Sequence, residues 1–199
     1  MSFMLLGILN SQAAGGGITS SYEHVTTTTL TSSTSQISVS LGNNPYADYK
    51  HLRILIMSRS TRNDQIDTVR IRFNSVTSGY SYHGGRVENT DWSTGDSVGT
   101  YSPYITLNKT WASQLNSNAF TQMSLEFPNF RSTDMKPQVL YSGGGMAAAN
   151  NSSATQVKFG SGLNGNISAS SVLSSVQFLM ASGNFAVGTE VRIYGLKDA

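Results

Sequence analysis

The segment of residues 49–74 reads YKHLRILIMSRSTRNDQIDTVRIRFN and carries the two strongest strand patterns of the chain. Residues 52–57 form an apolar run interrupted only by Arg53 and too short for a typical helix, so we expect a strand buried, or nearly buried, on both faces. Residues 69–73 alternate apolar and basic side chains, the pattern of a strand with one face in water. A polar loop, residues 58–67, joins them. We therefore expect two antiparallel neighbours at the centre of a β-sandwich.

Shorter patterns of the same kind recur along the rest of the 199 residues. Alternating or β-branched segments predict strands at residues 22–30, 36–41, 120–127, 174–182 and close to the C-terminus. Helical periodicity is almost absent, and no internal repeat or second domain is visible. The sequence predicts an all-β, antiparallel β-sandwich over residues 21–199, of jelly-roll type if the strands alternate between two sheets.

The first 20 residues differ from the rest, because a short apolar run is followed by alanines and three consecutive glycines. The run contains no charge, and no Lys or Arg precedes it, which argues against a secretory signal peptide. It is also far too short to cross a bilayer, so we expect no membrane insertion. We expect residues 1–20 to form an assembly anchor and a glycine hinge. The alternative is that the run folds back on its own domain. The anchor side chains are Phe3, Met4, Leu5, Leu6, Ile8 and Leu9.

Charged residues make up only 12% of the chain, about half the usual share, and the net charge is +2. Nucleic-acid binding requires a concentrated basic stripe that neutralises several phosphates. The only local cluster is the set of arginines at positions 53, 59, 62, 70 and 72, and arginine is common on the wet face of a strand. The composition therefore favours a neutral, hydroxyl-rich surface and no nucleic-acid partner.

Residues 75–100 form a long polar region in which aromatic side chains stand among Gly, Ser and Asn. Rigid amphipathic rings beside adaptable polar groups are typical of recognition surfaces. We expect a recognition loop containing Tyr80, Tyr82, His83 and Trp92, with a sugar or another protein as its target. The alternative is that these rings cover the open edge of the sandwich.

The sequence predicts no catalytic residues, no cofactor and no bound metal. The three histidines do not lie at a metal-ligand spacing, and the chain contains no cysteine and no Gly-x-Ser-x-Gly motif. Glu88, Asp91 and Asp96 leave a glycosidase-like carboxylate pair open as an alternative. Asn63, Asp64 and Asp67 could hold a calcium ion in a loop, but they lack the spacing of a known calcium-loop motif, which favours a turn-capping role.

Four parts of the sequence resemble the small virion proteins of tailed bacteriophages. These are the opening MSFMLLGILNSQAAGGG, the segment YKHLRILIMSRS, the strand VRIRFN followed by YSYH, and the closing GNFAVGTEVRIYGLK. The resemblance implies an exposed β-sandwich component that assembles as an oligomer on the tail or the head. It brings no catalytic residues.

We therefore expect a virion structural protein of the tail or baseplate that is not an enzyme and is assembled in the host cytoplasm. Its expected partners are other virion proteins and further copies of itself, with a trimer favoured, and a host surface glycan is a further candidate. One alternative is a capsid decoration protein on the head. An alternative of another class is a free carbohydrate-binding module.

Overall fold

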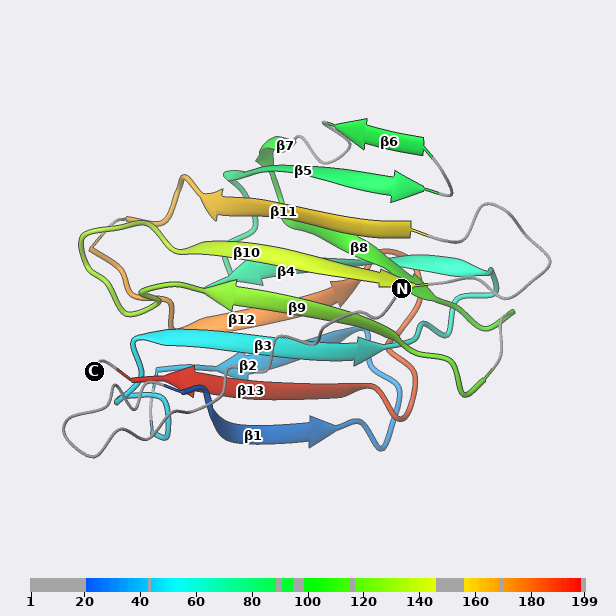
Figure 1. Cartoon of the computed structure of the whole chain (residues 1–199), viewed down its shortest axis with the longest axis horizontal. Helices are drawn as coiled ribbons and strands as arrows, with labels where there is room; N and C mark the ends of the chain where they lie inside the picture. Colours follow the sequence, from blue (N-terminus) through cyan, green and yellow to red (C-terminus); the bar gives the residue numbers. More distant parts are fainter. Residues whose placement is uncertain are drawn as a thin grey trace, which may run out of the picture.

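The computed structural model describes residues 21–197, except residues 43, 89–90, 95–98, 115–116, 146–155 and 169. Thirteen strands and no helix are found in this part of the chain. The strands form two antiparallel sheets that pack face to face, with the smaller sheet behind the larger one in Figure 1. The predicted all-β sandwich is confirmed.

The larger sheet has nine strands in the order β1-β13-β3-β9-β10-β11-β5-β6, with β7 paired to β5. In that order the strands span Glu23–Thr29, Glu190–Leu196, His51–Ser58, Thr121–Phe127, Gln138–Gly145, Gln156–Asn164, Tyr80–Glu88 and Asp91–Thr94, and β7 spans Gly99–Ser102. The smaller sheet has the order β2-β12-β4-β8. Its strands span Gln36–Ser40, Ser175–Met180, Ile66–Phe73 and Ile105–Trp111.

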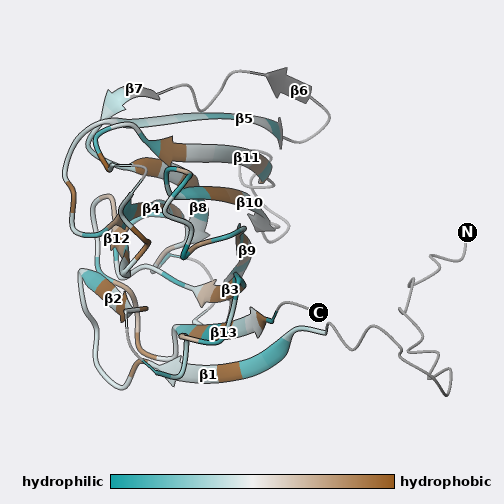
Figure 2. Cartoon of the chain, turned by 90° about the vertical axis from the view of Figure 1, so that its left-hand side faces the viewer, coloured by the Kyte–Doolittle hydropathy of each residue, from teal (hydrophilic) through white to brown (hydrophobic). Residues whose placement is uncertain are grey.

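The chain passes repeatedly from one sheet to the other, as in a jelly roll. Strands β1, β13, β3 and β9 form one half of the large sheet, and their sequence neighbours β2, β12, β4 and β8 form the small sheet. This alternation gives the eight strands of a double-sheet jelly roll. Figure 2 shows β2 and β12 in one layer and β13, β3 and β9 in the other. Strands β5–β7 and β10–β11 extend the large sheet beyond this core.

Two details predicted for the central segment are wrong. Strands β3 and β4 are not neighbours, because β3 pairs with β13 and β9 whereas β4 pairs with β12 and β8. The polar loop carries the chain across to the opposite sheet, so the apolar faces of both strands meet in one core. Strand β3 is also buried on one face only: Ile54 and Ile56 are inaccessible, while Met57 on the other face is 39% exposed.

The core contains a cluster of aromatic rings around Phe73 of β4. Its ring makes edge contacts with Tyr80 and Phe127 of the large sheet, at centroid distances of 5.7 and 6.0 Å. The Tyr80 hydroxyl accepts a hydrogen bond from the Phe73 backbone N–H (2.7 Å) and donates to the Val76 carbonyl (2.9 Å). Phe73 therefore joins the two sheets through its ring and holds a buried tyrosine through its backbone.

Replacing Phe73 by alanine should lower the free energy of unfolding by about 2 to 5 kcal/mol, because it leaves a cavity between the sheets. The matched control is Met57→Ala, which removes an exposed side chain on the outer face and should cost less than about 1 kcal/mol. Urea denaturation followed by circular dichroism measures both. A loss below about 1 kcal/mol for Phe73→Ala would contradict its central place in the core.

Candidate functional site

Exposed apolar side chains gather on the outer face of the large sheet, the face turned away from the core. Leu140 of β10 is 50% exposed, and Val157, Phe159 and Leu163 of β11 are 47, 40 and 38% exposed. The three β11 residues share a face because side chains alternate along a strand. We call these four residues the outer-face patch. Single exposed apolar residues are ordinary, but a contiguous group is typical of an interaction surface.

A groove of about 410 Å³ is lined by two residues of the outer-face patch, Leu140 and Phe159. Its floor is largely bare backbone, because Gly84 pairs with Gly160 and Gly85 pairs with Phe159 across β5 and β11. A Cβ atom added to Gly160 would lie 2.5 Å from the His83 carbonyl oxygen, so this close approach requires glycine. The groove is lined by His83, Gly84, Gly85, Leu140, Tyr141, Phe159, Gly160 and Ser161.

The chain enters the sandwich across this same outer face. Tyr22, just before β1, donates a hydrogen bond from its hydroxyl to Glu126 Oε2 (2.8 Å), and the Arg53 guanidinium lies 4.3 Å from its ring centroid. Arg53 and Glu126 also form an ion pair. Arg53 is the register partner of Glu126, and Glu126 is the partner of Leu140. Arg53, Glu126 and Leu140 therefore lie side by side on three neighbouring strands, and Tyr22 contacts the first two of them.

The predicted recognition loop is instead largely strand, since residues 80–88 form β5 and residues 91–94 form β6. The prediction for Tyr80 is wrong, because strand alternation places its ring between the sheets and fully buried. The Tyr82 hydroxyl donates to Thr106 Oγ1 of the small sheet (3.2 Å), so this ring also leans inward. His83 lines the groove. The side chain of Trp92 and the whole predicted anchor lie outside the described part of the chain.

Sequence reasoning missed the outer-face patch although the pattern was present. The β11 sequence QVKFGSGLN alternates apolar residues with Lys158, Gly160 and Gly162. We would have placed the apolar set inside and the lysine outside. The structure has the opposite arrangement: Lys158 is 6% exposed and Phe159 is 40% exposed. Period-two alternation defines two faces of a strand without stating which one is covered.

The arginines of the central segment do not converge on one site. Arg53 pairs with Glu126, and Arg62 pairs with Asp64 at 3.0 Å. Arg70 stacks on the Tyr104 ring at 4.0 Å from its centroid. These arginines are held by separate partners on both sheets, so they form no common anion site.

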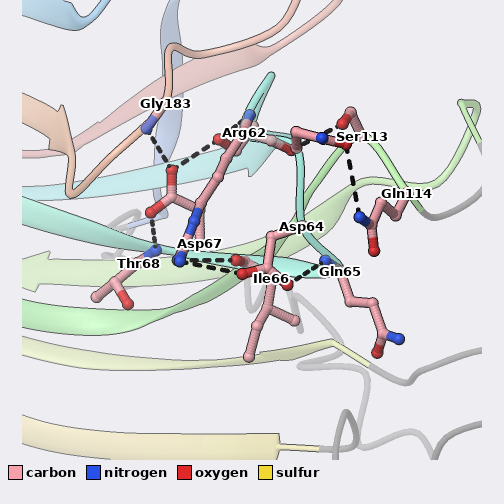
Figure 3. A network of polar contacts seen from close by, with 11 residues as sticks. Arg62, Asp64, Gln65, Ile66, Asp67, Thr68, Ser113, Gln114 and Gly183 are labelled. Atoms are coloured by element: carbon pink, nitrogen blue, oxygen red, sulfur yellow. Dashed lines mark hydrogen bonds and ion pairs between the residues drawn. The ribbon is translucent and has the colours of Figure 1, made fainter.

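Asp67 is a structural carboxylate in a polar network between two loops (Figure 3). It is only 1% exposed. Its Oδ2 accepts hydrogen bonds from Ser60 Oγ (2.7 Å) and the Gly183 N–H (2.8 Å), and its Oδ1 accepts one from the Thr68 N–H (2.7 Å). These bonds fasten the β3–β4 loop to the β12–β13 loop. Among the residues that the structure describes, no three His, Asp or Glu side chains are grouped to hold a metal ion.

The carboxylate alternative stays untested at this point. Glu88 and Asp91 are register partners at the ends of β5 and β6, and their side chains lie outside the described part.

No helix in the described ranges is long and apolar enough to cross a membrane. Comparison of the sequence with models of protein families and with curated proteins finds no match.

Replacing Asp67 by asparagine should lower the free energy of unfolding by about 1 to 3 kcal/mol. The new amide group would face two buried donors, Ser60 Oγ and the Gly183 N–H, in place of an acceptor. The control is Asp64→Asn in the loop that precedes β4, a half-exposed partner of Arg62 whose loss should cost at most about 1 kcal/mol. Equal unfolding midpoints for the two variants in urea would contradict this role of Asp67.

The environment of Tyr22 gives a test of the contact on the outer face. Burial, the hydrogen bond to Glu126 and the negative charge of that carboxylate raise the pKa of Tyr22 from 10.0 to about 12. Folding thus favours the neutral phenol, and the stability that it contributes below pH 10 is lost as the pH rises to about 12. We expect Glu126→Gln to lower the pKa of Tyr22.

Carbon-13 NMR titration of the tyrosine Cζ signals, with Tyr22→Phe for assignment, measures this pKa. The control is Glu190→Gln, which removes a carboxylate of the same sheet that pairs with Arg192. An unchanged pKa of Tyr22 in Glu126→Gln would show that the tyrosine does not lie against Glu126.

Proposed function

We propose that the chain is a structural component of a bacteriophage virion, exposed on the tail or the baseplate. In this role it is a subunit that binds other virion proteins and further copies of itself, and it catalyses no reaction. The observation that carries the proposal is the outer-face patch with its groove, because an exposed apolar face on an otherwise polar sandwich suits a permanent protein contact.

The chemistry of the remaining surface supports the same role. Only 12% of the residues are charged, and Ser, Thr, Asn and Gly are abundant, so much of the surface is hydrated through neutral groups. A jelly roll with an extended large sheet offers a broad face for a neighbouring subunit, and a standard interface takes about 800 Å² from each partner. The resemblance to phage virion proteins in four sequence segments points in the same direction.

The structure bears differently on the two alternatives, a capsid decoration protein and a free carbohydrate-binding module. A capsid decoration protein on the head would use the same outer face, so the geometry does not separate it from a tail component. A free carbohydrate-binding module needs aromatic rings on the surface; Tyr80 is buried and Tyr82 is directed at the small sheet, whereas Tyr101 is 78% exposed. Two of the four rings expected in the recognition loop are therefore directed into the sandwich and do not support glycan binding.

Immunogold electron microscopy of purified particles tests the proposal. Antibodies against residues 21–199, which lack the anchor, should label the tail or the baseplate of the phage that encodes the chain. Mass spectrometry of the same particles should detect the protein. Label on the head would assign the decoration role instead. Absence of the protein from particles that contain all other structural proteins would overturn the proposed function.

A further inference from the structure

Two groups of residues in this chain are rich in apolar side chains and carry no charge. The first is the outer-face patch, in which four side chains on β10 and β11 are between 38 and 50% exposed. The second is the run of residues 3–9, FMLLGIL, which contains six large apolar side chains. Each would gain about 25 cal/mol for every Å² of apolar surface that it buries against the other.

The groove fits a short segment better than a folded domain. Its volume of about 410 Å³ lies near the lower end of the range for small-ligand pockets, roughly 300 to 1,000 Å³. No Lys, Arg, Asp or Glu lines the groove, and the run of residues 3–9 has no charged side chain. Binding of the run therefore removes no Lys, Arg, Asp or Glu from water, which keeps the cost of desolvation low.

The point where the chain enters the sandwich lies on this same face. Tyr22 is held over Arg53 and Glu126, and Leu140 lies two strands from Arg53, roughly 10 Å away at the usual strand spacing. The 12 residues between the run and Tyr22, residues 10–21, reach roughly 40 Å when extended. The run can therefore reach the groove of its own copy or leave its own sheet and reach that of a neighbour.

We propose that residues 3–9 of one copy occupy the outer-face groove of a neighbouring copy. This inference rests on the proposed function, since a subunit of an assembly must be joined to a neighbour and the tether is long enough to make that join. Each copy supplies one run and one groove, so the contact is head-to-tail and closes into a ring when the rotation between copies permits it. A trimer is the smallest ring of this kind above a dimer.

Cysteine cross-linking tests the contact directly, because the natural chain contains no cysteine. We would combine Leu6→Cys with Ser161→Cys, an exposed position in the lining of the groove. The matched control combines Leu6→Cys with Ser38→Cys, an exposed position on β2 of the small sheet. Both double variants would be oxidised in the full-length protein at the same concentration and compared on non-reducing gels. A disulfide requires Cα atoms about 4.4 to 6.8 Å apart.

We expect covalent dimers and higher oligomers from the Leu6/Ser161 pair, at least tenfold more than from the Leu6/Ser38 pair. A cross-link confined to single chains would overturn the inference and assign the run to its own copy. Equal yields from the two pairs would overturn it too.

A charge placed in the groove provides the second variant. In light scattering, we expect Phe159→Asp to be monomeric and Ser38→Asp to form the same oligomer as the unmodified protein. If Phe159→Asp stays oligomeric, the groove is not the contact, although the protein can still be found on virions. Absence from virions, by contrast, is a failure of the proposed function itself.

Discussion

The structure depends on one constraint: the two sheets share a single apolar interface, and the small sheet covers only one face of the large sheet. The small sheet packs its four strands against the large sheet of nine, with Phe73 in contact with Tyr80 and Phe127 at the junction. Strand alternation then directs every second residue of the large sheet away from the core. The side chains on the outer face of β10 and β11 are therefore not constrained by packing between the two sheets.

Much of the fold could be predicted from the sequence, but the site could not. The alternation in residues 69–73 identifies a strand with one buried face, and such patterns together define the sandwich. A loop does not state whether it joins neighbours or crosses between sheets, so β3 and β4 were paired incorrectly. Tyr80 was read as loop because its strand is rich in Gly and Ser. The exposed face of β11 could not be predicted from alternation, because Lys158, a residue seldom buried, lies inside.

The proposed contact between the apolar run of one copy and the groove of the next gives a physical account of how copies would assemble. Burying the run alone on a smooth polar surface would gain little, whereas the groove offers apolar walls and a glycine floor with few groups to desolvate. Tyr22 fixes the place where the tether leaves the domain, through Glu126 and Arg53. The sandwich has an exposed apolar groove, and the tethered segment of residues 3–9 is apolar as well. This combination suits a subunit that binds further copies of itself.

Multi-angle light scattering of the full-length protein and of residues 15–199 tests this account most directly. All thirteen strands begin after residue 22, so the shortened chain should keep the same far-ultraviolet circular dichroism. We expect the full-length protein to form a closed oligomer, with a trimer favoured, and residues 15–199 to be monomeric. Equal masses for the two proteins, either both oligomeric or both monomeric at every concentration, would contradict the role of the apolar run in assembly.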